Sequence, residues 1–281
     1  MLKFLKARFP NSKIKFAGKG SASVAFIVDE NIIRFSKHGI ARYKTEAKVT
    51  DFIRDKIHVQ IPNIMVVEDA QYPYAIHKML VGNNWDADII NSLPVKSRKQ
   101  FIKDYVGIVC ALHDIGVEAA KTAIPELGFR EFLRLESNEF KRCLKGYFSE
   151  SEIDALYVKY ERFFDSPSKK TALLHYDFTG ENSLIDDRFR ITGIFDWCEA
   201  GLGDVTYEFY KLAKSCNNSF LEEILHEYEN QSGIRIDIEK VKEIRFIDTV
   251  RKIHRDSVLE SIADTERDGI LLNIGKLRLW L

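Results

Sequence analysis

The segment Leu173–Phe209, LLHYDFTGENSLIDDRFRITGIFDWCEAGLGDVTYEF, decides how the rest of the chain is interpreted. Asp177 lies two residues after His175, and Asn182 lies five residues after Asp177. Asp196 follows fourteen residues after Asn182, at the end of a β-like run. A carboxylate beside an attacking hydroxyl, with an amide oxygen and a second carboxylate for Mg²⁺, is what phosphoryl transfer from a nucleotide requires. The segment therefore predicts transfer of phosphate to a small molecule.

Each of these residues has a simpler interpretation when it is taken alone. Asp177 and Asn182 flank a Thr-Gly turn, and Asp and Asn are common turn residues. Asp196 ends the apolar run 190–196, where a charge is costly unless a cation receives it. The alternative for Asp196 is a helix N-cap, but Asp204 is the better N-cap candidate because an apolar helical face follows it.

A glycine-containing segment, GKGSAS at 18–23, lies between two β-like runs near the N-terminus. Gly18 and Gly20 would let backbone N–H groups approach phosphates, and Ser21 and Ser23 would add donors. The alternative is an ordinary hairpin turn that requires a positive φ. The segment is not a Walker A motif, because the spacing to a Lys-Ser or Lys-Thr pair is wrong.

Charged and imidazole side chains in apolar surroundings form a further set of candidates. Arg34 lies within a β-like run, where it could pair with phosphates and be held by Glu46 of the next helix. The alternative for Arg34 is a surface position on an edge strand. We expect His113 and His175, each preceded by apolar residues, to be buried histidines that orient loops by hydrogen bonding.

The overall composition indicates an ordinary globular protein. The 281 residues are 45% hydrophobic and 30% charged, and 42 Lys plus Arg balance 42 Asp plus Glu. A nucleic-acid partner is not expected at zero net charge, and no apolar run is long enough for a membrane span. Four separated cysteines without a CxxC pair indicate reduced thiols, no zinc site and a cytoplasmic location.

The hydrophobic pattern predicts an α+β chain in two parts. Alternating runs predict antiparallel strands in the first part, with one helix at 41–57, and helical periodicity dominates after residue 95. The expected strands are 13–16, 23–28, 32–35, 64–68 and 74–79, and the expected helices are 97–115, 129–147 and 151–164, with a β segment at 172–196. We expect residues 1–80 to form a small nucleotide-binding N-lobe. Residues 81–281 would form a larger helical C-lobe with the catalytic loop and acceptor site.

The ordered set of motifs is more specific than any one of them. HYDFTGEN (175–182), IFDW (194–197) and GDVTYEF (203–209) together resemble the aminoglycoside phosphotransferase and choline kinase-like superfamily, relatives of the protein kinases. GKGSASVAFIV (18–28) and YAIHKMLVG (74–82) are weaker points of resemblance. The resemblance implies a two-lobed protein-kinase-like fold, with a small antiparallel N-lobe sheet and a mainly helical C-lobe.

The resemblance also implies roles for residues of the motifs. Asp177 would be the catalytic base, and Asn182 and Asp196 would bind Mg²⁺. Tyr176 stands where the family frequently has Gly, and Val205 where it usually has Pro. No catalytic acid or metal ligand is missing, so an active enzyme is expected.

The nucleotide, ATP or GTP, would be held by the first part of the chain. Arg34 stands where the family usually has a phosphate-binding Lys, with Glu46 as its partner and Lys37 as a substitute. The backbone around Lys78 and Leu80 would hydrogen-bond the purine. Arg is itself a bidentate phosphate ligand, so its presence need not abolish function.

The acceptor implied by the resemblance is a hydroxyl of a small, amine-bearing molecule, with an aminoglycoside antibiotic favoured. Glu181, Glu199 and Glu208 lie near the motifs and would receive amines. The alternatives are a choline, amino-alcohol or sugar kinase of the same fold, a macrolide kinase, or a nucleotide-binding regulator without catalysis. The enzyme would be a monomer or a homodimer, and any role in antibiotic resistance would depend on the acceptor.

Overall fold

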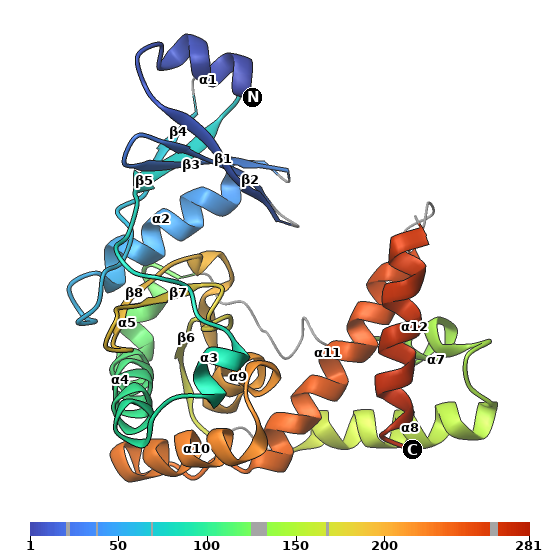
Figure 1. Ribbon diagram of the computed structural model, residues 1–281. Helices are drawn as coiled ribbons and strands as arrows, with labels where there is room; N and C mark the ends of the chain where they lie inside the picture. The colour runs from blue at the N-terminus through green and yellow to red at the C-terminus, as the bar shows by residue number, and fades with distance from the viewer. Residues whose placement is uncertain (21–22, 38, 69, 125–133, 167–168, 259–263) are drawn as a thin grey trace.

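The computed structural model describes residues 1–20, 23–37, 39–68, 70–124, 134–166, 169–258 and 264–281. Figure 1 shows a β-sheet at one end of the molecule and a mainly helical part at the other, with helix α2 between them. The arrangement is the α+β architecture that the hydrophobic pattern predicts. Ser21 lies outside the described residues.

The sheet is antiparallel and has five strands in the order β1-β2-β3-β5-β4. Its strands are β1 (Ile14–Lys19), β2 (Ser23–Val28), β3 (Asn31–Ser36), β4 (Met65–Val67) and β5 (Tyr74–Lys78), which confirms the five predicted strands. Helix α1 (Leu2–Arg8) covers one end, and its Leu5 joins Phe26, Ile33 and Phe35 in a small apolar cluster. The period-2 alternation of the strands therefore corresponds to one buried face.

Helix α2 (Ala41–Ile53) links the sheet to the helical part. It ends four residues before the predicted end at 57, although Ile57 is buried like Val49 and Ile53. The apolar residue Ile57, which led to a predicted helix end at 57, is thus buried in the turn that follows the helix. These three side chains belong to the core of the helical part, so α2 packs against the helical part as well as the sheet.

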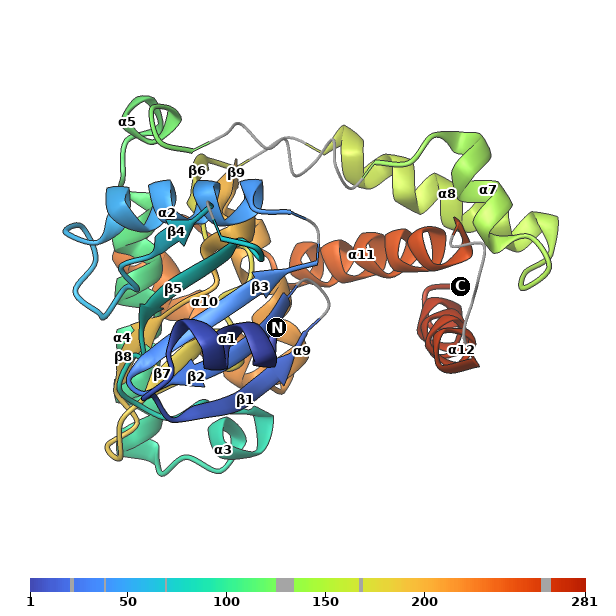
Figure 2. The ribbon, with the colours of Figure 1, turned by 90° about the horizontal axis from the view of Figure 1, so that it is seen from above.

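The helical part is built on four long helices. They are α4 (Val95–His113), α8 (Glu150–Asp165), α10 (Asn218–Ser232) and α11 (Ile238–Val258). Shorter helices are α3 (Ala87–Asn91), α5 (Val117–Lys121), α7 (Ser137–Leu144) and α9 (Phe209–Ser215), and a further helix, α12 (Asp264–Arg278), is as long as α10. Figure 2 shows α7, α8 and α12 on the side away from α4, as Figure 1 does. The predicted helix 129–147 is confirmed over α7, and residues 129–133 lie outside the described part of the chain.

Local signals in the sequence explain where several helices begin and end. Ser149 and Glu152 form a capping box at the start of α8, and Asn217 accepts from the N–H of Phe220 at the start of α10. Gly233, with φ 72°, ends α10 in the left-handed conformation. No helix among the described residues is both long and apolar enough to span a membrane.

The segment 171–208 forms two short strand pairs instead of one β run. Strand β6 (Thr171–Leu174) pairs with β9 (Gly201–Asp204), and β7 (Ser183–Ile185) pairs with β8 (Ile191–Ile194). The single-turn helices η1 (Trp197–Glu199) and η2 (Val205–Glu208) follow β8 and β9. The two pairs bring the ends of β6 and β8 together, which positions the site.

Candidate active site

The catalytic-loop segment leaves β6 through His175, which is fully buried. Its Nδ1 accepts a hydrogen bond from the Asp177 N–H at 3.2 Å, so the ring proton resides on Nε2. That nitrogen lies 3.1 Å from the carbonyl oxygen of Phe195 and donates to it. One neutral imidazole therefore ties the loop of Asp177 to the residue before Asp196, which confirms the orienting role expected of His175.

Tyr176 explains how a tyrosine fits where the family frequently has glycine. Its φ is 63°, the left-handed region that glycine occupies most easily. The ring is buried, and the hydroxyl donates to the carbonyl oxygen of Leu202 at 3.2 Å. A Cβ added at Gly203 would lie 1.9 Å from that hydroxyl. The Tyr176 side chain therefore occupies space that glycine at 203 leaves open.

Asp177 faces a lysine that the sequence reasoning missed. Lys211 of α9 places Nζ 2.9 Å from Oδ1 of Asp177, and both side chains are roughly three-quarters buried (22% and 27% exposed). Burial opposes the charge of Lys211, but Asp177 outweighs burial and the pKa of the ammonium is raised. Lys211 therefore remains a cation beside the carboxylate. A lysine within the otherwise apolar start of α9 is the signal that could have found it.

Asn182 is bound to both sides of the site through its backbone and side chain. Its Nδ2 donates to the carbonyl oxygen of Asp177 at 3.0 Å, which directs the amide oxygen away from that contact. Its own carbonyl oxygen accepts from the N–H of Phe195 at 2.9 Å. Asn182 therefore lies next to Phe195, the residue that precedes Asp196, although thirteen positions separate Asn182 and Phe195 in the sequence.

Asp196 ends β8 in a left-handed conformation with φ 61°. It occupies the N-cap position of η1, but its side chain makes no capping hydrogen bond. The side chain is 42% exposed, and Oδ1 lies 3.9 Å from Nη1 of Arg34. The N-cap interpretation of this carboxylate is therefore wrong. Asp204 is the N-cap of η2, and it accepts from the N–H of Thr206 at 2.8 Å, as expected.

The predicted pair of Arg34 and Glu46 is formed. Nη2 of Arg34 lies 2.6 Å from Oε2 of Glu46, whose side chain is fully buried. Strand β3 lies between β2 and β5, so the edge-strand alternative for Arg34 is wrong. Burial opposes the charge of Arg34, but Glu46 outweighs it and the pKa is raised. Nε of Arg34 is buried and has no hydrogen-bond partner among the described residues.

Glu46 also holds the residues after Asp196. Its Oε1 accepts from the N–H of Trp197 at 3.3 Å, and its Oε2 accepts from Sγ of Cys198 at 3.1 Å. Burial raises the pKa of the Cys198 thiol well above its usual range, so this sulfur remains protonated. Sheet, α2 and η1 are therefore connected through one buried carboxylate.

Mg²⁺ fits the oxygen donors of Asn182 and Asp196 by chemistry. Hard cations take carboxylate and amide oxygens, and Asp196 is partly exposed, which leaves room for water and phosphate ligands. Carboxylate and sulfur atoms of Glu46, Asp196 and Cys198 also lie within 4.8 Å of one another. A neutral thiol and a carboxylate already paired with Arg34 are poor ligands for Mg²⁺. The pair of Asn182 and Asp196 is therefore the better match.

The glycine-containing segment connects two paired strands, and a side chain would fit at the positions of Gly18 and Gly20. The N–H of Gly20 donates to the carbonyl oxygen of Ser23 at 3.0 Å, and Lys37 donates to the carbonyl oxygen of Gly20. A Cβ at Gly18 or Gly20 would meet nothing within 4 Å, and neither residue has a positive φ. The positive φ of the hairpin alternative is therefore not observed at these two glycines, and contact with phosphates stays a prediction.

The segment after β5 runs against the β7–β8 pair. Gly82 has φ 141°, and a Cβ there would lie 2.6 Å from Oγ1 of Thr192. Lys78 is exposed, and its carbonyl oxygen accepts from Nδ1 of His77 at 2.8 Å. Leu80 lies beside Gly193 of β8, because a Cβ at that glycine would be 3.1 Å from the Leu80 side chain. Purine binding by the backbone around Lys78 and Leu80 stays a prediction.

The three glutamates predicted to receive amines lie in different environments. Glu208 is fully buried, and its Oε2 accepts from the N–H of His175 at 2.9 Å. Glu208 therefore positions the loop and cannot meet an acceptor, which corrects the prediction for this residue. Glu181 is exposed, and Glu199, 48% exposed, lies 3.4 Å from Nη2 of Arg42.

A cavity of about 450 Å³ opens beside Lys211. Its wall includes Tyr176 and Tyr210, and α11 supplies a large share of its polar groups. The charged residues of the wall are Arg42, Glu199, Lys211, Asp248, Arg251, Lys252 and Arg255. Because Lys211 is paired with Asp177, this cavity adjoins the predicted catalytic carboxylate.

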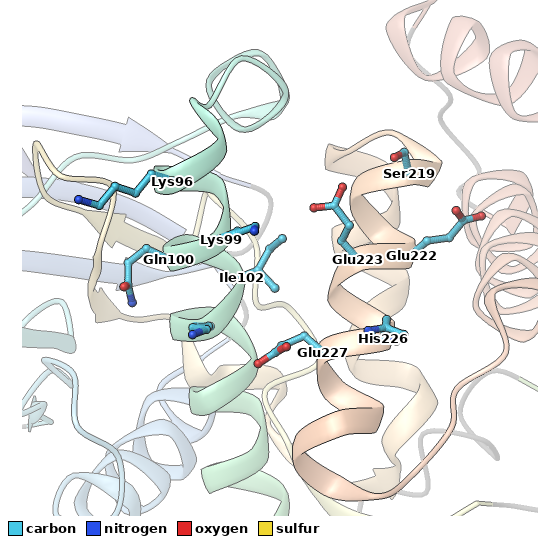
Figure 3. A pocket seen from close by; sticks show the side chains of 10 residues that line it. Lys96, Lys99, Gln100, Ile102, Ser219, Glu222, Glu223, His226 and Glu227 are labelled. Atoms are coloured by element: carbon cyan, nitrogen blue, oxygen red, sulfur yellow. The ribbon is translucent and has the colours of Figure 1, made fainter.

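A second groove, of about 700 Å³, lies between α4 and α10 and is shown in Figure 3. Lysines of α4 face glutamates of α10 across it, and Arg98 pairs with Glu223 at 2.6 Å. None of the predicted site residues lines this groove, so we assign it no role.

A protein-family model agrees with this arrangement. The model of the phosphotransferase enzyme family matches residues 13–244. The chain belongs to this family. The match spans the sheet, α2, the catalytic loop and the first turns of α11, so the family covers every predicted catalytic and metal-binding residue.

Solved structures of aminoglycoside and macrolide phosphotransferases share the fold. Wild-type aminoglycoside 2'-phosphotransferase-IIIa with GDP matches with a TM-score of 0.83 at 18% identity, over 99% of this chain and 97% of that chain. The ternary complex of streptomycin, ATP and APH(2")-IIa gives 0.71 at 17%, over 99% and 95%. Macrolide 2'-phosphotransferase MphH from Brachybacterium faecium gives 0.69 at 14%, over 96% of each chain. The two-lobed, kinase-like fold is confirmed, and the boundary between residues 80 and 81 stays a prediction.

Proposed function

We propose that this phosphotransferase is a small-molecule kinase, which transfers the γ-phosphate of ATP or GTP to a hydroxyl. The observation that carries the proposal is the convergence of three groups from separate segments. Asp177 and Asn182 are joined by a side-chain hydrogen bond, and the backbone of Asn182 is joined to the residue before Asp196. One structural neighbour is described as a GDP complex and another as a complex with ATP. These descriptions support GTP or ATP as the donor.

In the proposed reaction the acceptor oxygen forms a bond to the γ-phosphorus while the bond from phosphorus to the β–γ bridging oxygen breaks. Asp177 orients the hydroxyl and takes its proton, and the nucleoside diphosphate leaves. Arg34, fixed by Glu46 and 3.9 Å from Asp196, would pair with the phosphates. Mg²⁺ at Asn182 and Asp196 would neutralise phosphate charge. Positioning and electrostatic stabilisation supply most of the acceleration in such transfers.

The finer choice of acceptor is the weakest part of the resemblance. An aminoglycoside is favoured by structural neighbours whose names include an aminoglycoside. Of the three acids expected to receive amines, however, Glu208 is buried and Glu199 faces Arg42. We therefore propose a small alcohol as the acceptor and keep aminoglycosides, macrolides, choline and sugars as acceptors to be tested.

The test is transfer of labelled γ-phosphate from Mg-ATP and Mg-GTP to such a panel, with Asp177→Ala beside the unmodified protein. We expect Asp177→Ala to lower kcat by about 10²–10⁴ while nucleotide binding, measured by calorimetry, persists. Asp187→Ala, at an exposed turn outside the site, serves as the matched control and keeps full turnover.

The rival hypothesis is a nucleotide-binding protein without transfer activity. It predicts nucleotide binding with no Asp177-dependent product for any acceptor. That result would overturn the kinase proposal and leave the family assignment intact.

A further inference from the structure

The cavity beside Asp177 has a cationic wall. Five of its lining side chains are cationic, and two are carboxylates. The cationic residues come from α2, α9 and α11, so three separate elements contribute positive charge to one space: Arg42, Lys211, Arg251, Lys252 and Arg255. A volume of about 450 Å³ suits a small acceptor.

The two carboxylates of the wall are already engaged by cations. Asp248 lies 2.6 Å from Nζ of Lys214 and 3.0 Å from Nζ of Lys252, and only 10% of its side chain is exposed. Glu199 lies 3.4 Å from Arg42. These acids therefore stabilise lysine and arginine side chains and are poorly placed to receive an amine from an acceptor.

Carboxylates just outside the wall do not reverse the excess. Asp177 pairs with Lys211, and Asp256 lies 2.7 Å from Arg255. When both are counted, together with Lys214, cations still outnumber carboxylates in this set of described residues. Burial lowers the pKa of Arg251, and the nearby Asp248 and Glu199 oppose this effect.

Part of this positive charge belongs to the nucleotide side. Arg42 interacts electrostatically with Cys198 and Asp196, so it lies towards the proposed metal ligand Asp196. The cations of α11 lie on the other side, on successive turns of that helix. Tyr210, which interacts with Asp177, Glu199, Asp248 and Arg251, connects the catalytic carboxylate to α11. The α11 cations therefore face the space that an acceptor would enter.

We infer that the acceptor carries an anionic group, a carboxylate or a phosphate, bound by Arg251, Lys252 and Arg255 while its hydroxyl meets Asp177. The inference rests on the proposed kinase function and narrows its substrate class. Guanidinium groups bind either anion through two parallel hydrogen bonds, so the wall serves both. A polycation such as an aminoglycoside would meet charges of its own sign there.

The first arm of the test measures binding, which does not depend on catalysis. With the nucleotide site saturated by a non-hydrolysable ATP analogue and Mg²⁺, calorimetry follows glucose 6-phosphate, gluconate, glucose and kanamycin. We expect binding of at least one anionic probe, and weaker binding of glucose and kanamycin. Binding of kanamycin in preference to both anionic probes would overturn the inference.

The second arm uses variants of the α11 wall. Arg251→Gln and Arg255→Gln should each lower the affinity for the anionic probe by about tenfold or more, since each removes a charge-assisted hydrogen bond. Both variants should leave nucleotide affinity unchanged. Lys96→Gln, in the groove between α4 and α10, is the matched control and should change nothing. Equal anion affinity in all three variants would refute the assignment of the wall.

The third arm separates this inference from the proposed function. Asp177-dependent transfer to glucose or kanamycin, with none to anionic probes, would support the kinase and overturn the anionic acceptor. Anion binding at α11 without any transfer would overturn the kinase and support the binding wall. Preference between glucose 6-phosphate and gluconate identifies which anion the wall selects.

Discussion

At the scale of single residues, the pair of Asp177 and Lys211 governs the chemistry of the site. Nζ of Lys211 lies 2.9 Å from Oδ1 of Asp177, and the pair is largely buried. The lysine fixes the orientation of the carboxylate and adds positive charge where the γ-phosphate would be transferred. We propose that its role is to position Asp177 as the base.

Replacing Lys211 tests that role. Lys211→Met should lower kcat about ten- to hundredfold, because a charge-assisted hydrogen bond to the base is lost, with KM for the nucleotide nearly unchanged. Lys211→Arg should recover part of the rate. The pH–rate profile is the decisive measurement, since a merely structural role leaves its shape unaltered. Lys96→Met is the control, and an unchanged kcat in Lys211→Met would contradict the prediction.

Gly203 is required by the hydroxyl of Tyr176. A Cβ at 203 would lie 1.9 Å from that oxygen, so Gly203→Ala should lower the free energy of unfolding by about 1–3 kcal/mol. Tyr176→Phe removes the oxygen and should recover much of the loss in the double variant. Urea unfolding measures both effects. Gly107→Ala, in an open position of α4, should stabilise by up to about 1 kcal/mol and provides the comparison.

At the scale of elements, β5 carries a buried histidine next to the segment that crosses to the helical part. His77 is 8% exposed, and burial lowers its pKa to about 4. In the unfolded chain the pKa of this imidazole is near 6.5. Between that pH and about 4, the unfolded chain therefore binds a proton that the folded protein does not bind. The free energy of unfolding should therefore fall by about 2 kcal/mol between pH 7 and pH 5 from this group alone.

The measurement is urea unfolding across that pH range. His77→Gln should flatten this part of the pH dependence, whereas the exposed His226→Gln should leave it unchanged. An identical slope in His77→Gln and the unmodified protein would show that another group is responsible.

The elements predicted correctly from the sequence are those that a pattern of neighbouring residues defines. The five sheet strands alternate with a buried face, and the capping box of α8 is visible as Ser149 and Glu152. The convergence of Asp177, Asn182 and Asp196 follows from family motifs, and the structure joins their segments by hydrogen bonds.

What the sequence could not supply depends on contacts between distant segments. The burial of Glu208 comes from its packing under the backbone of His175, thirty-three residues away. Lys211 meets Asp177 because α9 lies beside the loop, and although a lysine in an apolar helix start marks it as unusual, the sequence does not name its partner. Strand β9 forms only because β6 is there to pair with it.

At the scale of the whole molecule, α2 joins the sheet to the helical core. Val49, Ile53 and Ile57 pack within the larger core, while Glu46 of the same helix binds Arg34 of the sheet. We expect this shared helix to couple the two parts during unfolding, so that one cooperative transition is observed.

Ile53→Ala tests this coupling. Truncation of a fully buried isoleucine should lower the free energy of unfolding by about 2–5 kcal/mol, and sheet and helix signals should shift together. Val158→Ala, at an exposed position of α8, should change it by less than about 0.5 kcal/mol. Two separate transitions, with only one displaced by Ile53→Ala, would contradict a single folding unit.

The contact of Lys211 with one oxygen of Asp177 has a consequence for regiochemistry. With Oδ1 held by the ammonium, a polyol would reach the proposed base through the other carboxylate oxygen. An acceptor anchored at its far end by α11 then presents one hydroxyl to that oxygen. Such an enzyme forms a single positional isomer of the phosphorylated product, and loss of either contact should yield a mixture.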